Sequence, residues 1–311
     1  MATLHSDETP AAPGTAKLRP REAEDWLNRY VYHPPARRLA RLLAPTGITP
    51  NMVSIAGGVS IVAAGGAYTL IPWPAGVVLG FLLHAFWHVL DGADGELARL
   101  TGRSSPTGEL IDGVCDYAGH AFLYLTLAIF IFPAVGHWAW AVGWAAGLSH
   151  AAQSNHAESQ RRTYLWWAYG VPWLKHAEAA DDAVFRQRNW LSRAFAWLAR
   201  GYLKLAEASD PYAAEVDALI AGTEADPRRR EIIARLAREQ GRASLLYQKL
   251  VGANPRAPIL ALAMTLGSPL HYFLAEIVLL NLLLIASIRH HRAASRRLAR
   301  QARLALSEAD G

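Results

Sequence analysis

The sequence predicts an all-α integral membrane protein with six transmembrane helices, an N-terminal juxtamembrane amphipathic helix and a cytoplasmic helical insertion. Three observations support this fold class. Apolar segments that are long enough to cross the ~30 Å hydrocarbon core of a bilayer recur along the 311 residues. Arginine and lysine gather in alternate loops between these segments. A charged, alanine-rich stretch after the fourth segment has the periodicity of solvent-exposed helices.

The chain is expected to begin with a disordered tail that leads into an amphipathic segment. Residues 1–20 mix acidic and basic residues with Pro and Gly, which is typical of disorder. In the juxtamembrane segment 21–48, the leucines and arginines of the run 34–47 fall on opposite helical faces. This pattern favours a helix that lies in the lipid headgroup plane, and a soluble amphipathic helix is the alternative.

Six segments are predicted to span the membrane, and they divide into two groups. The predicted spans are 52–71, 75–98, 110–132, 136–160, 256–268 and 270–288. The first four belong to a unit at 49–161, and the last two belong to a unit at 256–289. Residues 162–255 form the predicted cytoplasmic insertion, because their charges recur at the i,i+4 spacing of a helix. Residues 290–311 form a basic cytoplasmic tail.

The distribution of charge predicts the orientation in the membrane. The net charge is +5, and the arginines that flank the predicted spans are Arg37, Arg38, Arg41, Arg99, Arg103, Arg161, Arg162, Arg289, Arg292, Arg296 and Arg297. Six spans place all of them on one side, whereas the opposite loops at 71–75, 132–138 and 266–272 contain no Lys or Arg. By the positive-inside rule, both termini of this cytoplasmic-membrane protein are cytoplasmic. Topology and anionic lipid account for the basic charge, so no nucleic-acid partner is expected.

Four aspartates cluster where the second and third predicted spans reach the cytoplasm. Asp91 and Asp94 are three residues apart, so they project from one face of their helix. Asp112 and Asp116 are four residues apart and do the same on the next helix. The short connection between the helices sets the two pairs facing each other. A carboxylate at membrane depth costs about 2.5–3.5 kcal/mol, and four of them also repel one another.

A divalent metal site would offset this cost. The aspartates have no Cys or His cluster with zinc spacing beside them, and carboxylate oxygens suit Mg²⁺ or Mn²⁺. Two such ions bridged by four aspartates would form the clamp used for in-line displacement at phosphorus. Gly95 and Gly108 leave room for a ligand beside the acidic pairs, and Arg99 supplies a cation for phosphate oxygens. Helix packing and membrane topology are the alternative explanations for these three residues.

Together these residues form the pattern D-x2-D-G-x2-A-R-x8-G-x3-D-x3-D. Its positions are filled by Asp91, Asp94, Gly95, Ala98, Arg99, Gly108, Asp112 and Asp116. In this pattern the sequence resembles the CDP-alcohol phosphotransferases. The six-helix plan and the amphipathic helix extend the resemblance beyond residues 91–116, whereas the insertion at 162–255 departs from the family core.

The resemblance implies a reaction and a role for each residue of the pattern. A CDP-linked alcohol binds, an acceptor hydroxyl attacks the β-phosphorus, and CMP leaves. Asp91, Asp94 and Asp112 correspond to ligands of a two-metal site. Asp116 corresponds to the general base and also contacts a metal. The positions that surround the cytidine diphosphate are Gly95, Ala98, Arg99 and Gly108. The resemblance also implies a homodimer.

Residues that would bind the acceptor are indicated less sharply. Arg161 and Arg162 follow the fourth span and are candidates for holding an acceptor phosphate, and topology alone is the alternative. His88 and His120 extend the acidic stripes by one helical turn and are candidates for hydrogen bonding to a metal-binding carboxylate, with ordinary packing as the alternative. Glu276 lies inside the sixth span, where an ionisable residue suggests a function and an interhelical hydrogen bond is the alternative.

The expected activity is phosphatidyl transfer from CDP-diacylglycerol to a polar alcohol such as inositol phosphate, glycerol phosphate, serine or choline. The bilayer, the CDP-alcohol and the polar alcohol are the expected partners. Within the family, the alternatives are a CDP-choline or CDP-ethanolamine donor with a lipid hydroxyl acceptor, and a soluble donor of the CDP-inositol type. Other classes are an aromatic prenyltransferase, whose acidic motifs lie on distant helices, an ion-coupled transporter and a catalytically silent membrane scaffold.

Overall fold

The computed structural model describes residues 20–172, 197, 200, 201, 203, 204, 206–223 and 226–308, and these residues form helices and no strands. The expected disordered tail at 1–20 lies outside the described residues except for Pro20, and so does part of the insertion at 162–255.

The amphipathic segment forms helices that lie against the long helices of the bundle. The N-terminal helices are η1 (Arg21–Ala23), the π-helix η2 (Asn28–Tyr32) and α1 (His33–Leu43). Ala36 and Ala40 of α1 are buried against Ala93 and Leu97 of α3 (Ala75–Leu100). Leu42 is 71% exposed. Alanine therefore forms the face that contacts the protein, and Leu42 remains available to lipid.

The long helices α2 to α5 are joined by short connections. They are α2 (Pro50–Leu70), α3, α4 (Pro106–Val135) and α5 (Trp138–Tyr169). Helix α2 contacts both α3 and α4, and α4 also contacts α5. Glycine permits the close approach of α2 and α4, because a Cβ atom on Gly58 would lie 3.2 Å from the carbonyl oxygen of Cys115.

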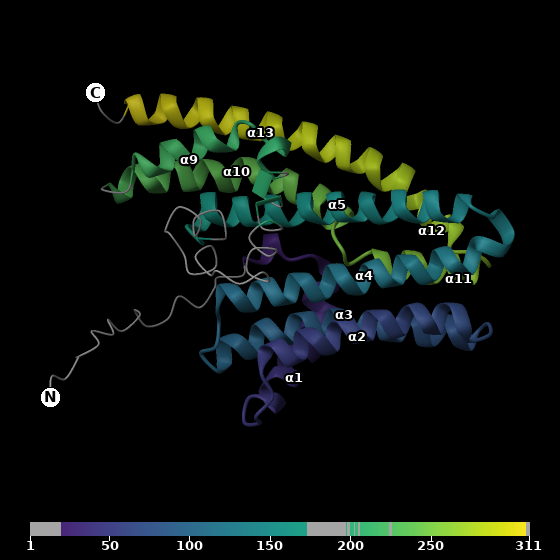
Figure 1. Cartoon of the computed structure of the whole chain (residues 1–311). Helices are drawn as coiled ribbons and strands as arrows, with labels where there is room; N and C mark the ends of the chain where they lie inside the picture. Colours follow the sequence, from purple (N-terminus) through teal and green to yellow (C-terminus); the bar gives the residue numbers. More distant parts are fainter. Residues whose placement is uncertain are drawn as a thin grey trace, which may run out of the picture.

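The described residues from Ala213 onwards form a second group of helices, of which α9 and α10 lie inside the predicted insertion at 162–255. These are α9 (Ala213–Ala221), α10 (Pro227–Val251), α11 (Arg256–Thr265), α12 (Leu270–Leu274), the π-helix η3 (Ala275–Leu280) and α13 (Asn281–Glu308). Figure 1 shows α2, α3 and α4 together, with α5 between them and the group of α9, α10 and α13. Helix α5 therefore connects the two parts of the molecule.

Among the described residues, four helical segments are long and apolar enough to cross a membrane. They are Pro50–Leu70, Ala75–Leu100, Ile111–Val135 and Leu270–Glu308. They coincide with four of the six predicted spans, and the structure is that of an integral membrane protein by these criteria. Helix α5 is long enough, but its C-terminal half is rich in polar residues, and α11 has only 10 residues.

The C-terminal end of α5 packs with α10 and α13 in a helical cap, whose core includes Trp167, Ile233 and Leu298. Asp210, just before α9, accepts a hydrogen bond of 2.6 Å from Ser295 and lies 3.0 Å from Nε2 of His291. Burial raises the pKa of Asp210, but the hydrogen bonds and the charge of His291 outweigh it and hold the pKa below its ordinary value. The ionised carboxylate thus helps to fix α13 to the insertion.

We expect Gly119→Ala to destabilise the bundle, because a Cβ atom there would lie 2.1 Å from Cγ2 of the fully buried Ile61. Overpacking of this kind costs about 1–3 kcal/mol. Gly113→Ala, on the same helix, is the control, since no atom lies within 4 Å of its added Cβ. The measurement is the thermal unfolding midpoint in detergent. Equal midpoints for the two variants would contradict the close approach of α2 and α4.

Candidate active site

The candidate site lies on the helical hairpin formed by α3 and α4. Helix α3 ends at Leu100, and Gly102 follows with a φ of +66°, a left-handed conformation that favours glycine. Ser105 caps α4 by accepting a hydrogen bond of 3.0 Å from the backbone N–H of Gly108. Pro106 then occupies the first turn, where no N–H is required. The chain therefore reverses within a few residues and brings the two acidic helix ends together.

Three of the four aspartates converge at one point. Oxygen atoms of Asp91, Asp112 and Asp116 lie within 4.8 Å of one another. Asp94 lies outside this triad, although its carboxyl group is within hydrogen-bonding reach of Asp112. One Asp94 oxygen accepts a hydrogen bond of 2.5 Å from Ser54 on α2, and the other accepts one from the N–H of Gly95. Asp94 is therefore anchored to α2 while it faces the triad.

The triad fits a divalent metal ion. All donors are carboxylate oxygens, which Mg²⁺ and Mn²⁺ prefer. Their separations allow a single ion to contact an oxygen of each residue. Three carboxylates this close together in an apolar bundle would repel one another without a cation. A divalent cation would balance this charge.

A tryptophan that the sequence analysis did not single out contacts the candidate base. The indole N–H of Trp87 donates a hydrogen bond of 2.7 Å to Oδ1 of Asp116. Trp87 is buried on α3, four residues before Asp91. The i,i+4 spacing places Trp87 on the same helical face as Asp91, so its position near the acidic residues could have been predicted from the sequence. Ser54 had no such signal, because it lies 40 positions from its partner.

The residues expected around the cytidine diphosphate lie on both sides of the hairpin. A Cβ atom on Gly95 would find only Nη1 of Arg99 nearby, at 3.5 Å, whereas one on Gly108 would lie 3.2 Å from Oγ of Ser105 and 3.6 Å from Oδ1 of Asn51. Arg99 donates a hydrogen bond of 2.5 Å to Glu96, and Ala98 is half-buried on the same helix. Gly95 therefore leaves space beside its acidic helix, and Gly108 allows the close approach of its own capping residue.

The two candidate acceptor residues are engaged with acidic side chains. Arg161 and Arg162 each donate hydrogen bonds of 2.6 Å to Oε1 of Glu158. Arg162 also lies 3.6 Å from Glu109 on α4. The structure thus places Arg162 beside the hairpin and pairs both cations with carboxylates.

The two histidines make different contacts from those expected. His120 lies with Nδ1 2.8 Å from the backbone oxygen of Asp116, and not from its carboxylate. His88 stacks on Tyr32 of η2 with ring centroids 4.4 Å apart.

Comparison with known proteins adds a family match over the same segment. Residues 47–162 match the family model described as CDP-alcohol phosphatidyltransferase. A phosphatidylinositol phosphate synthase of Mycolicibacterium smegmatis is 31% identical over 105 residues, which are 32% of this chain and 44% of that protein. An archaetidylinositol phosphate synthase of Pyrococcus horikoshii is 34% identical over 96 residues, 30% of this chain and 48% of that protein.

An ethanolaminephosphotransferase 1 of Homo sapiens is 29% identical over 115 residues, 32% of this chain and 28% of that protein. The chain thus spans less than half the length of each of these curated relatives. All four carboxylates of the hairpin lie inside the matched segment.

Proposed function

We propose that this protein is a membrane phosphotransferase of phospholipid biosynthesis, because residues 47–162 match the family model of the CDP-alcohol phosphatidyltransferases. It transfers a phosphatidyl group from CDP-diacylglycerol to the hydroxyl of a polar alcohol and releases CMP. The observation that carries this proposal is the convergence of Asp91, Asp112 and Asp116 within the matched segment. Two related synthases of inositol-phosphate lipids support a phosphorylated alcohol as the acceptor.

The hairpin residues divide the chemistry between them. Asp91, Asp94, Asp112 and Asp116 would hold two Mg²⁺ or Mn²⁺ ions, which supply charge neutralisation for the pyrophosphate when bound. Asp116, oriented by Trp87, takes the proton from the acceptor hydroxyl. The hydroxyl oxygen bonds to the β-phosphorus as the bond from that phosphorus to the oxygen of CMP breaks. The lining residues for the nucleotide are Gly95, Ala98, Arg99 and Gly108.

We also propose the six-span topology for the whole chain. The units are 21–48 as the juxtamembrane segment, 49–161 with four spans, 162–255 as the insertion, 256–289 with two spans and 290–311 as the tail. Helices α5 and α11 supply the spans beyond the four that length and hydropathy select. The arginine distribution supports cytoplasmic termini in the cytoplasmic membrane. Homodimerisation rests on the family resemblance.

Arg161 and Arg162 are proposed to bind the acceptor phosphate, which would replace Glu158 as their partner. We expect Arg162→Gln to raise KM for a phosphorylated acceptor by about tenfold, since a hydrogen bond to a charged group contributes about 1.5–3 kcal/mol. KM for CDP-diacylglycerol should not change. The control is Arg289→Gln, which removes an exposed arginine of α13. An unchanged acceptor KM in Arg162→Gln would exclude this role.

A second candidate function is transfer from CDP-ethanolamine or CDP-choline to a lipid hydroxyl. The similarity to an ethanolaminephosphotransferase favours it. In that case the CDP-linked donor carries the polar alcohol, and the lipid acceptor has no phosphate for Arg161 and Arg162 to bind.

The test is CMP release by purified protein in nanodiscs with Mg²⁺ or Mn²⁺. CDP-diacylglycerol is combined with inositol phosphate, glycerol phosphate, serine and choline in turn, and CDP-ethanolamine and CDP-choline are combined with diacylglycerol. Acceptor-dependent release from CDP-diacylglycerol is the expected result. Turnover only with the second set would establish the alternative. If no donor gives CMP release, both proposed activities are excluded, and a membrane scaffold or a transporter remains.

A further inference from the structure

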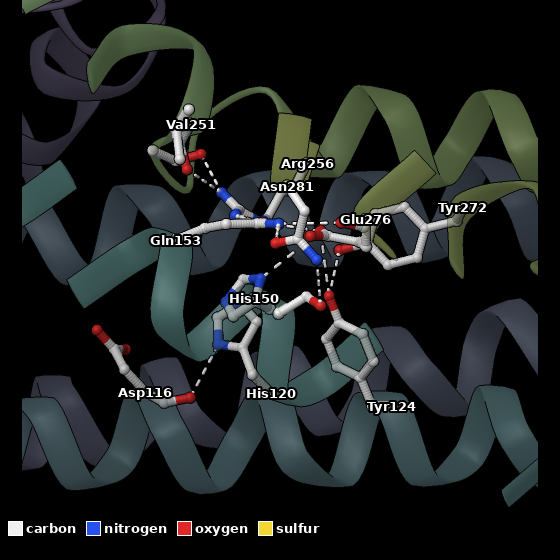
Figure 2. Close-up of polar contacts among 12 residues, drawn as sticks. Asp116, His120, Tyr124, His150, Gln153, Val251, Arg256, Tyr272, Glu276 and Asn281 are labelled. Carbon is white, nitrogen blue, oxygen red and sulfur yellow. Dashed lines mark hydrogen bonds and ion pairs between the residues drawn. The ribbon is translucent and has the colours of Figure 1, made fainter. Parts of the chain in front are cut away.

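A fully buried ion pair stands at one end of a polar network that runs through the bundle (Figure 2). Nε of Arg256 on α11 donates a hydrogen bond of 3.0 Å to Oε1 of Glu276 on η3. Gln153 of α5 accepts a bond of 2.7 Å from Arg256 and donates one of 2.9 Å to the backbone oxygen of Glu276. Tyr124 also donates to Glu276 Oε1, at 3.1 Å. Glu276 is therefore held from three helices.

The network continues from Glu276 to a pair of stacked imidazole rings. Nδ1 of His150 on α5 lies 3.7 Å from Glu276 Oε1, within ion-pair range. The His150 ring stacks on His120 of α4, with centroids 4.8 Å apart and an interplanar angle of 25°. Both histidines are buried. The position of the His120 ring therefore depends on His150.

His120 in turn lies against the candidate base and its hydrogen-bond donor. Its Nδ1 is 2.8 Å from the backbone oxygen of Asp116. Its ring meets Trp87 edge-on, with centroids 4.5 Å apart. Trp87 is the residue whose N–H binds Oδ1 of Asp116. A shift of the His120 ring would therefore move both the indole and the carboxylate that it orients.

Packing alone does not account for these polar residues. Nδ1 of His150 and Oε2 of Glu276 are buried without a hydrogen-bond partner among the described residues. Such atoms are costly in an apolar bundle, and leucine or phenylalanine could fill the same space without that cost. Every apolar replacement of His150 would lose the polar ring nitrogens, whereas phenylalanine would keep a ring that stacks on His120.

We propose that His150 is a positioning residue for Asp116, holding it through the ring of His120 and the indole of Trp87. The ion pair of Arg256 and Glu276 anchors His150 from helices that lie outside the family segment 47–162. This proposal rests on the proposed function, in which Asp116 takes the acceptor proton. Residues that surround a ligating or catalytic group in this way typically change affinity or activity by about 10–100-fold when they are altered.

The test compares His150→Ala with His150→Phe, because phenylalanine keeps a ring that can stack on His120. We expect His150→Ala to lower kcat for CMP release by about tenfold, with KM for both substrates within twofold of the parent. His150→Phe should restore most of kcat. Ser287→Ala is the control, since it removes a buried hydrogen bond of 2.9 Å between α13 and His156 of α5, a contact that involves neither His120 nor Asp116.

Three outcomes would overturn the proposal. In the first, His150→Ala lowers kcat no more than Ser287→Ala does. In the second, KM rises while kcat is unchanged. In the third, kcat of His150→Phe is as low as that of His150→Ala, which would show that ring stacking on His120 does not position Asp116.

Mn²⁺ binding, followed by electron paramagnetic resonance, separates this proposal from the proposed function. If the parent protein binds Mn²⁺ but releases no CMP from any donor, the proposed function fails. The proposed positioning of Asp116 is then tested by the affinity for Mn²⁺ alone. We expect His150→Ala to weaken Mn²⁺ binding by about tenfold and His150→Phe to bind like the parent. Parent-like affinity in His150→Ala would overturn the proposal.

Discussion

Asp116→Asn is expected to abolish acceptor-dependent CMP release. Asparagine has nearly the same shape and can still accept the hydrogen bond from Trp87, but it cannot take a proton from the acceptor hydroxyl. Loss of a general base lowers rates by about 10²–10⁴-fold, and loss of one negative charge also weakens the carboxylate triad. The measurement is kcat with saturating donor and acceptor.

Asp226→Asn is a matched control for that variant. Asp226 caps α10 by accepting hydrogen bonds from the N–H groups of Arg228 and Arg229. Asparagine is an equally good cap, so the same chemical change should leave turnover and stability unchanged. More than a tenth of the parent kcat in Asp116→Asn would exclude Asp116 as the base.

Arg256→Gln is expected to produce the largest loss of stability among single substitutions of the bundle. Arg256 and Glu276 are both fully buried, so removing the cation leaves an uncompensated carboxylate. Breaking a buried ion pair in this way costs about 3–5 kcal/mol. The double variant Arg256→Gln, Glu276→Gln should recover much of that loss, because neither partner then carries a charge. The thermal unfolding midpoint in detergent reports both effects.

Arg303→Gln is the control for Arg256→Gln, because it removes the arginine of an exposed ion pair. Arg303 pairs with Glu215 at 2.8 Å, and the side chain of Arg303 is 62% exposed. Surface pairs contribute about 0–1 kcal/mol, so this variant should unfold close to the parent midpoint. A double variant that is no more stable than Arg256→Gln would contradict the assignment of the loss to unpaired charge.

The aspartate hairpin could be predicted because its determinants are local. Helical spacing places Asp112 and Asp116 on one face, and the short connection closes the hairpin. The surroundings of Asp94 could not be predicted in the same way, since Ser54 approaches from another helix. That contact depends on how α2 packs against α3, which no short pattern encodes.

The buried ion pair of Arg256 and Glu276 is a second contact between distant parts of the sequence that could be predicted only in part. The position of Glu276 inside an apolar span indicated that it needs a partner. That this partner is Arg256 could not be predicted, because the pairing depends on how α11 folds back beside η3. The predicted span 136–160 concerns the membrane segment alone, and the helix α5 itself continues to Tyr169. The pairing of Glu158 with Arg161 and Arg162 supports the helix just beyond the predicted span.

Helix α5 runs without interruption from Trp138 to Tyr169 and forms one stiff rod. Its 32 residues extend about 48 Å at 1.5 Å per residue, well beyond the ~30 Å hydrocarbon core. A bilayer of different thickness is accommodated by tilting such helices. The middle of α5 carries His150, and its C-terminal end is packed against α10 in the cap. In the proposed six-span topology, a tilt of α5 in a bilayer of different thickness would therefore displace both the cap and the contacts of His150 with the acidic hairpin.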